Sequence, residues 1–484
     1  MILVASVDKQ YVREEVDKVK SDFDKLCESG KISPETKVLF SSMFMIMNLI
    51  LSIFMEKTTR KNSKNSSIPS SQSDLDTSTD YNSRKKANKK NDDNDVASNS
   101  KTTQIVVIET VNNCNCCGHD LTNVKAHAHE RRTKIDIVFE KVVTHVDVDI
   151  KSCPHCKIDV KAHFPKDMHG PLQYGNGLKA YVINLACTQM ISLCRIQKLI
   201  KAMVGQSLSQ ASILKYIWTL YNSLEDWETK AKQEILKAPA MNVDETSLNV
   251  KSKTHKGKHW IHIYCANDIT LKYLHKSRGN EAIKDIQIIP KYTGIIIHDC
   301  WASYFSYKNN KDALCGSHTL RDLFFIEESN NYQWAKDMQQ LLKETCHKVS
   351  ISVKKKLRYK SFKKVKIKYR KILYDGNNEM PEIPIKQKGK RGRVPKSDAH
   401  NLLERLVKYE DAVLLFAINA DVSFTNNRAE RDLRMAKVKQ KVSGCFRTDK
   451  YAHAYCRITS YLQTMANKGV NPLIAIELAL ANKI

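Results

Sequence analysis

The 484-residue sequence predicts an α/β protein in which a mixed sheet carries a helical insertion. Three short β-rich runs, at 241–250, 259–268 and 270–277, precede a helical run at 279–290 and a continuous apolar run that begins at 294. A continuous apolar run is typical of a strand buried on both faces. Two cysteine pairs and an apolar N-terminal helix come before the sheet. The expected order is therefore a helical segment, a cysteine-containing module and an α/β core.

The charge of the chain indicates a polyanionic partner. Lysine and arginine number 79 against 52 aspartates and glutamates, which gives a net charge of +27. A surplus of this size is typical of nucleic-acid binding, with membrane-surface binding and solubility through charge as alternatives. The N-terminus lacks a basic region followed by an apolar export signal, so we expect a cytoplasmic protein associated with the nucleoid. The 14 cysteines then fit metal ligands or small buried side chains better than disulfides.

Residues 1–56 are predicted to form a helical, coiled-coil segment that self-associates. The run 38–55 is almost wholly apolar and approaches the length of a membrane span. Its apolar residues recur in steps of four and three, however, which is typical of a helix-pairing seam. The seam consists of Leu39, Met43, Ile46, Ile50 and Ile53. We therefore expect pairing and no membrane contact. Residues 57–103, which are rich in Ser, Asn, Lys and Asp, are predicted to be a disordered linker.

Residues 104–165 contain two Cys-x-x-Cys pairs, Cys114 with Cys117 and Cys153 with Cys156. Each pair fits a tight turn that directs two thiolates to a tetrahedral zinc ion. The alternating residues between the pairs predict a hairpin that would bring the two turns together. We expect a zinc-binding module with structural Zn²⁺, and the alternative is an incidental spacing of reduced cysteines.

Residues 166–236 are predicted to be a helical DNA-binding region. A helix up to about residue 203, a turn at Gly205 and a second helix opened by Ser207 match the outline of a helix-turn-helix. Any helical hairpin gives the same pattern, so a purely structural hairpin is an alternative.

Two aspartates lie at revealing places in the predicted sheet. Asp244 lies within the first strand, and Asp299 follows the apolar strand. If these two strands are neighbours, their carboxylates converge at one edge of the sheet, where ligands gather in α/β folds. Two carboxylates and a third from elsewhere can hold a pair of Mg²⁺ ions for phosphodiester chemistry.

Glu430 is a candidate for the third carboxylate. The spacing of Asn427 and Glu430 also fits a capping box, with Asn427 as the N-cap residue, so a structural role is the alternative. Basic residues recur every three positions along the same predicted helix, and we expect them to follow a DNA backbone. They are Arg428, Arg431, Arg434 and Lys437.

The long interval between Asp299 and Glu430 requires a helical insertion at about 320–420. Within it, basic residues alternate with Tyr359, Phe362 and Tyr369, which suits phosphate binding and base stacking. The alternative is a solvated helix whose aromatic rings pack inward. The candidate DNA-binding residues are Lys363, Lys364 and Lys366, with Arg391 in a basic segment downstream.

Several motifs together resemble the insertion sequence 66 family of transposases. Outside the core, the polar stretch 64–74, the cysteine motifs at 116–121 and 152–156, and the segment 170–185 are similar to family motifs. In the core, the similar segments are VDETSLNV, IIHDCWASY, CGSHTLRDLFF and TNNRAERDLRMAKVKQKVSGCFRT. Gly316 and Ser317 stand where the family usually has tryptophan and alanine, which leaves the role of Cys315 and His318 open.

The resemblance implies a ribonuclease H-like core at 237–450 that carries an Asp-Asp-Glu triad of Asp244, Asp299 and Glu430. It also implies Mg²⁺ (or Mn²⁺), cleavage at the 3′ ends of an element, strand transfer into target DNA, a homo-oligomer, and accessory proteins of the same element. A C-terminal helical segment, 451–484, completes the expected organisation. The alternatives are a nuclease or resolvase without joining activity and a decayed DNA-binding protein, although no carboxylate of the triad is missing.

Overall fold

A computed structural model describes residues 9–29, 32–58, 110–132, 141–165, 168, 170–251, 258–383 and 394–484. Most of the predicted linker, from residue 59 onward, lies outside these ranges. The chain divides into two compact units: residues 1–82 with 221–468, and residues 83–220 with 469–484. Each unit is described by itself.

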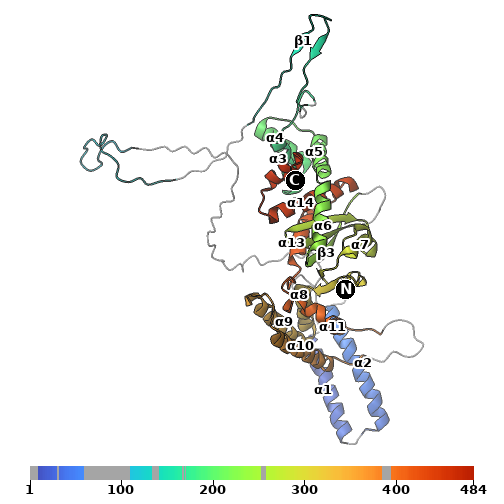
Figure 1. Ribbon diagram of the computed structural model, residues 1–484. Coiled ribbons are helices and arrows are strands. Elements are labelled where there is room, and N and C mark those ends of the chain that lie inside the picture. Colours follow the sequence, from blue (N-terminus) through green and yellow to red (C-terminus); the bar gives the residue numbers. More distant parts are fainter. Residues whose placement is uncertain are drawn as a thin grey trace, which may run out of the picture. The chain divides into compact units, whose positions relative to one another are not determined.

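The larger unit contains a mixed five-stranded sheet (Figure 1). Its strands are β3 Ala240–Leu248, β4 His259–Ala266, β5 Ile269–His275, β6 Ile295–His298 and β7 Lys311–Leu314. The spatial order is β5-β4-β3-β6-β7, with β3 antiparallel to β4 and parallel to β6. The mixed sheet and its first four strands are confirmed. The sequence did not predict β7, because the four residues KDAL are too short to show an alternating pattern.

Helices cover both faces of this sheet. Helices α6 Glu225–Lys237 and α7 Asn280–Ile286 pack against Val243 and its neighbours on one face. Helix α13 Asn427–Ser443 packs on β3 and β4, and α14 Asp449–Asn467 packs on β5. The hydroxyls of Ser460 and Thr464 on α14 accept hydrogen bonds from the backbone N–H groups of Lys272 and Thr270. Helix α14 thus covers the edge strand, and these bonds satisfy N–H groups that would otherwise be open to pairing.

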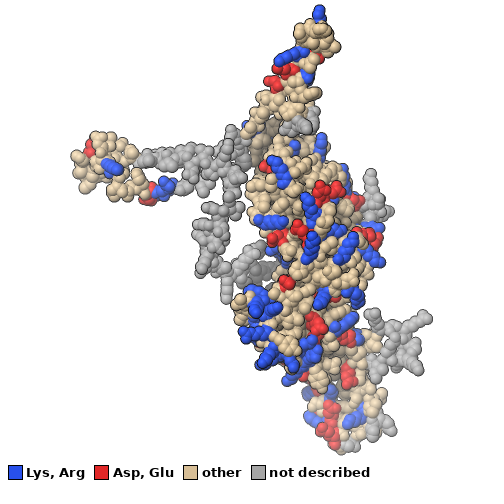
Figure 2. Space-filling view, in the orientation of Figure 1, with Lys and Arg blue, Asp and Glu red and all other residues tan. Residues whose placement is uncertain are grey.

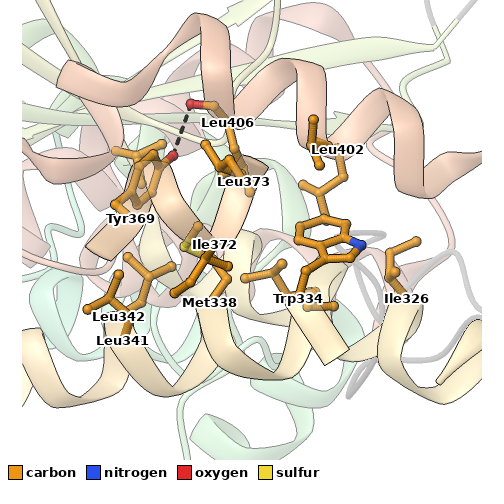
Figure 3. Packing of buried hydrophobic residues seen from close by; sticks show 14 of the residues in the cluster. Ile326, Trp334, Met338, Leu341, Leu342, Tyr369, Ile372, Leu373, Leu402 and Leu406 are labelled. Atoms are coloured by element: carbon orange, nitrogen blue, oxygen red, sulfur yellow. Dashed lines mark hydrogen bonds between the residues drawn. The ribbon is translucent and has the colours of Figure 1, made fainter. Parts of the chain in front are cut away.

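The insertion between the fourth strand and Glu430 is helical and has its own core, as the long interval predicted. Its helices are α8 Gly316–Asn330, α9 Gln333–Ile351, α10 Tyr359–Glu379, α11 Asp398–Lys408 and α12 Glu410–Leu414. Figure 3 shows Trp334 and Met338 of α9 packed against α10 and α11. Tyr369 lies in this core and donates its hydroxyl hydrogen to the Leu406 carbonyl oxygen at 2.9 Å (Figure 3).

The aromatic residues of α10 therefore do not form one stacking surface. Tyr369 is fully buried, and Phe362 packs against the insertion core. Only Tyr359 of the three is exposed. For Phe362 and Tyr369 the base-stacking interpretation is wrong, because their positions on the helix face the hydrophobic core.

The N-terminal segment forms a helical hairpin of α1 Lys9–Glu28 and α2 Pro34–Thr58 (Figure 1). Phe23 of α1 stacks on Phe40 of α2, with 5.3 Å between ring centroids. Helix α2 also packs on α8, and its end is held by a buried carboxylate. Glu56 accepts hydrogen bonds from the backbone N–H groups of Asp398 and Ala399 at the start of α11. Two otherwise unsatisfied donors of that helix are thereby paired.

The predicted pairing seam lies on the open face of α2. Leu39 is 69 % exposed and Ile50 is 61 % exposed, and Met43 and Ile46 are exposed as well, whereas Ile53 is half-buried. Residues 36–56 are long and apolar enough to cross a membrane by length and composition, a test that core helices of soluble proteins also pass. Self-association through this seam stays a prediction.

The smaller unit contains a short hairpin and a helical cluster. The hairpin is β1 Ile150–Ser152 with β2 Asp159–Lys161, and the helices are α3 Asn176–Cys187, α4 Leu193–Val204, most of α5 Gln210–Ser223, and α15 Pro472–Leu480. Helix α4 ends at Gly205, whose φ of 69° is left-handed. Ser209, and not Ser207, caps α5, since its hydroxyl oxygen accepts the N–H of Ser212 at 2.9 Å.

Ile50→Glu should reduce the number of chains in the oligomer that the full-length protein forms, because it places a charge in the middle of the seam. Light scattering after size-exclusion chromatography measures the change. Ser42→Glu adds the same charge at an exposed position of α2 outside the seam and should leave this number unchanged. An equal effect of both changes, or of neither, would contradict pairing through this seam.

Candidate active site

The register of the sheet brings Asp244 and Asp299 to one edge. Strands β3 and β6 are parallel neighbours, and their ladder ends where Asn242 lies opposite Ile297. Asp244 and Asp299 each come two residues after this pair, on β3 and directly after β6. They therefore lie on the same face of the sheet, close to each other. The predicted convergence of these two aspartates is thus what the strand pairing requires.

Helix α13 brings Glu430 to the same face, through Asn426. The side-chain amide of Asn426 donates to the Val243 carbonyl oxygen at 2.8 Å and accepts from Nδ2 of Asn242 at 2.9 Å. These two strand residues immediately precede Asp244. The first turn of α13, which contains Glu430, is consequently fixed beside that aspartate.

The predicted capping box is wrong. Helix α13 begins at Asn427, its N-cap residue is Asn426, and no side chain makes a capping hydrogen bond. The Asn426 amide is committed to β3, and its backbone N–H donates to the Cys315 sulfur at 3.1 Å. The Glu430 carboxylate therefore has no N-cap amide to reach and points elsewhere.

Glu430 faces helix α8. Its Oε1 lies 3.5 Å from Nδ1 of His318 and 3.8 Å from Nη2 of Arg321. Burial, followed by the positive charge of Arg321, lowers the pKa of His318, so its imidazole is neutral at pH 7. Potential ligand atoms of Cys315, His318 and Glu430 all lie within 4.8 Å of one another.

The electrostatics of the site favour a bound cation. Burial and then the nearby carboxylates of Glu245, Asp299 and Glu430 raise the pKa of Asp244 well above its usual range. Like charges that converge in this way repel one another unless a proton or a metal ion lies between them. The donors are carboxylate oxygens, which Mg²⁺ and Mn²⁺ prefer. The residues present therefore fit a divalent metal site.

A comparison with known protein families identifies the family of this chain. The family model described as "Transposase IS66 family" matches residues 171–454, more than half of the chain. The chain belongs to the IS66 transposase family. A search of curated proteins finds no match. The matched range contains the five-stranded sheet, the helical insertion and all three carboxylates.

The departure from the usual IS66 pattern at Gly316 has a steric explanation. A Cβ atom at this position would lie 2.2 Å from the Phe424 ring, and the Gly316 N–H donates to the Phe424 carbonyl oxygen at 2.7 Å. The phenyl ring of Phe424 thus occupies the space that a side chain at 316 would need. A side chain at 316 would have to displace this ring, and His318 lies in the first turn of α8, where it faces Glu430.

The basic residues of α13 do not form one stripe. Arg428 donates to the carbonyl oxygens of Asn267 and Ile269, and Lys437 donates to Ser247. These two residues fasten α13 to the sheet of this IS66 core. Residues three positions apart on a helix differ in direction by about 60°, so residues spaced by three do not stay on one face of the helix. Arg431 and Arg434 are exposed.

The lysines of the insertion also differ from one another. Lys363 and Lys364 are exposed on α10, whereas Lys366 lies 2.9 Å from carboxylate oxygens of both Glu410 and Asp411. Lys366 is therefore already neutralised by two carboxylates. Arg391 lies outside the described residues.

The two cysteine turns have the same backbone geometry. In each, the first cysteine donates its N–H to the carbonyl five residues later, and its own carbonyl accepts the N–H four residues later. The residue four positions after the first cysteine, Gly118 or Lys157, has a left-handed φ of 73° or 56°. Hydrogen bonds from backbone N–H groups within each turn lower the pKa of Cys114 and of Cys153. Lower thiol pKa values favour the thiolates that zinc requires.

Among the described residues, no group of three potential metal ligands includes Cys114, Cys117, Cys153 or Cys156. Residues 141–149 form no strand, and β1 pairs only with β2 within the second turn. The expected hairpin between the turns is therefore absent from residues 141–149, while residues 133–140 lie outside the described range.

Sequence reasoning missed Asn426, Arg321 and the buried Glu245, which are also part of the surroundings of the triad. Burial and then the charge of Asp299 raise the pKa of Glu245 to about 7. The only sequence signal for Asn426 is its place before Asn427 in the motif that carries Glu430. Its contacts with β3 join residues 183 and 184 positions apart, which local patterns do not reveal.

Asp244→Asn should raise the melting temperature of the metal-free chain at pH 7. The folded state binds the Asp244 proton more tightly than the unfolded state, so this stabilisation is present at low pH and is lost as the pH rises through the raised pKa. At about pH 4, close to the pKa of an unfolded-state aspartate, the gain should be small.

Thermal unfolding at the two pH values, with and without Mg²⁺, measures this effect. Added Mg²⁺ should stabilise the parent chain and not the variant. Asp226→Asn, at an exposed position of α6, is the control and should change the melting temperature at neither pH. A lower melting temperature for Asp244→Asn at pH 7 without metal would contradict the account.

Proposed function

We propose that this IS66 family member is a DNA transposase that cleaves the 3′ ends of its element and joins the freed 3′-hydroxyls to target DNA. The observation that supports the proposal is the approach of Asp244, Asp299 and Glu430 at one edge of the sheet, which we take to be a ribonuclease H-like core. Cleavage and joining are both in-line phosphoryl transfers. One site can serve both when water in the first step is replaced by a DNA hydroxyl in the second.

We propose that the three carboxylates hold Mg²⁺, or Mn²⁺ in its place. When bound, a pair of such ions activates the attacking oxygen and stabilises the leaving oxygen of a phosphodiester. The chain itself fixes the ligands. The strand pairing sets Asp244 against Asp299, and Asn426 holds the helix that presents Glu430.

His318 and Arg321 orient the Glu430 carboxylate in this proposal. Neutral His318 approaches Oε1 without adding a charge, and Arg321 adds a cation 3.8 Å away. Glu430 Oε1 is buried and makes no hydrogen bond with the described residues, so this oxygen remains available to a metal ion. No side chain has to act as a nucleophile.

DNA is the proposed partner of the exposed basic residues. Lysines and arginines gather on the surface over α9 and α10 (Figure 2). Lys363 and Lys364 are exposed on α10, and Arg431 and Arg434 are exposed on α13, the helix of Glu430. Arg391 remains part of the proposal. Because Lys366, Arg428 and Lys437 are engaged within the protein, we expect them to contribute less to DNA binding.

The cysteine turns are proposed to hold one structural Zn²⁺ between them. Their matching geometry and lowered thiol pKa values support this proposal. A homo-oligomer, joined in part through α2, and accessory proteins of the same element complete the proposed assembly. We expect it to act on DNA in the cytoplasm.

Glu430→Gln should fold and bind DNA as the parent does while losing cleavage and joining by about 100-fold or more, a loss typical of removing one group that stabilises the transition state. A neutral amide is a weak ligand for Mg²⁺. The assay incubates the full-length chain with Mg²⁺ and end-labelled DNA that carries the flanks of its own gene, and gel electrophoresis resolves cleaved and joined products.

Glu404→Gln is the matched control, because Glu404 is exposed on α11 and pairs with Lys396 away from the triad. It should retain parental activity. Near-parental cleavage by Glu430→Gln would remove this glutamate from the metal site. Cleavage without joined products would indicate a nuclease or resolvase.

Cys153→Ser should release the zinc, because three remaining thiolates hold a structural zinc ion poorly. Metal analysis of the purified parent chain should give about one Zn²⁺ per chain. Cys194→Ser, at an exposed cysteine of α4 outside both turns, should leave the zinc content unchanged. Absence of zinc from the parent would reject this part of the proposal.

A further inference from the structure

Arg278 is clamped beside the triad by groups to which the proposed chemistry gives no role. Its guanidinium carbon lies 4.4 Å from the ring centroid of Trp301 and 5.1 Å from that of Trp260. Its Nε and Nη2 donate to Oε1 of Glu245 at 2.7 and 2.6 Å. The buried hydroxyl of Tyr304 donates to the other oxygen of the same carboxylate at 2.6 Å. Two indole rings and one fixed carboxylate thus hold the guanidinium in a single orientation.

This cluster lies at the same strand ends as the triad but on the other face of the sheet. Consecutive residues of a strand point to opposite faces, so Glu245 lies opposite Asp244. Asp299 follows the end of β6, and its Oδ1 accepts at 3.2 Å the backbone N–H of Trp301, whose ring packs on Arg278. A DNA strand that crosses this edge to reach the triad would therefore continue past Arg278.

One edge of the guanidinium remains open. The Arg278 side chain is 39 % exposed, whereas the Glu245 side chain is 1 % exposed. Within the part of the chain that the structure describes, Nη1 has no hydrogen-bond or ion-pair partner. Nη1 and the second hydrogen of Nη2 form the free edge, which matches two oxygens of a phosphate group.

We propose that Arg278 binds a backbone phosphate of the DNA strand, next to the phosphate that is cleaved. This inference rests on the proposed function and assigns a phosphate-binding subsite to it. The two indole rings and Glu245 fix the guanidinium before DNA arrives, so little side-chain freedom is lost on binding. A fixed position for a neighbouring phosphate would align the scissile phosphodiester with the carboxylates.

The competing explanation is that Arg278 only neutralises the buried carboxylate of Glu245. A buried carboxylate without its cation is strongly destabilising, so Arg278→Gln alone would reduce binding in either case if the edge of the sheet distorts. Glu245→Gln with Arg278→Gln separates the two explanations. The double variant replaces the ion pair with two neutral amides that can hydrogen-bond to each other, and it leaves no unpaired charge.

The experiment measures the affinity of the full-length chain for two labelled duplexes of unrelated sequence by fluorescence anisotropy. Ca²⁺ replaces Mg²⁺ so that no cleavage occurs. Melting temperatures report folding. Lys276→Gln is the matched control, because Lys276 is an exposed cation of the same connection that pairs with Glu281. It should weaken binding by less than about threefold, as expected for an exposed ion pair.

Arg278→Gln and the double variant should both bind about tenfold more weakly than the parent on both duplexes, the loss expected for one charge-assisted contact. The slope of log K against log salt should fall by about 0.9, the value for one phosphate contact. Parental affinity in the double variant would reduce Arg278 to a counter-ion of Glu245 and overturn the proposal. A loss on one sequence only would indicate base recognition, and an equal loss for Lys276→Gln would indicate general charge. Both would overturn it.

Failure of the parent chain to bind either duplex would overturn the proposed function together with this subsite. Strong binding by the parent with unchanged binding by Arg278→Gln would overturn the subsite alone.

Discussion

The hydrogen bonds of Asn426 are the constraint on which the geometry of the site depends. Its buried amide is paired with two residues of β3, its N–H with the Cys315 sulfur at the start of α8, and its carbonyl oxygen with the Glu430 N–H at 3.2 Å. One residue thus connects the strand of Asp244, the helix of His318 and the helix of Glu430. Removal of the amide would leave buried polar groups of β3 unpaired, at a cost of about 1–3 kcal/mol. The same change would release the first turn of α13.

Further contacts along α13 extend this attachment. Arg428 binds the carbonyl oxygens of the β4–β5 turn, and Lys437 binds Ser247 near the end of β3. Between them, buried Asp432 accepts the hydroxyl hydrogen of Thr270 at 2.9 Å. Contacts at three positions along α13 fix the rotation of this helix about its axis, and thereby the direction in which Glu430 points. Three polar residues of the sequence motif therefore fix the position of the carboxylate. Arg431 and Arg434 are exposed, and Arg431 also lies 3.3 Å from Oδ1 of Asp432.

The sequence was informative where function depends on local pattern. Alternating and apolar runs predicted β3 to β6, and the two aspartates, one within β3 and one directly after β6, could be paired once these strands were taken as neighbours. Glu430 could be named only through resemblance, because a lone glutamate after two asparagines reads equally well as a helix cap. The capping box failed because the amide of the preceding residue bonds a strand far away in sequence, and tertiary contacts override local capping preferences. The same reason explains the inward aromatic rings of α10 and the clamp around Arg278.

The central claim is that Asp244, Asp299 and Glu430 form one divalent metal site, and metal-directed cleavage of the polypeptide tests it without any DNA substrate. Fe²⁺ takes the place of Mg²⁺, and ascorbate with peroxide then generates radicals that cut the backbone close to the bound ion. The account predicts cuts near residues 244, 299 and 430 together, suppressed by excess Mg²⁺ and all lost in Asp299→Asn. Cuts at only one of these segments, or cuts that persist in Asp299→Asn, would contradict a shared site.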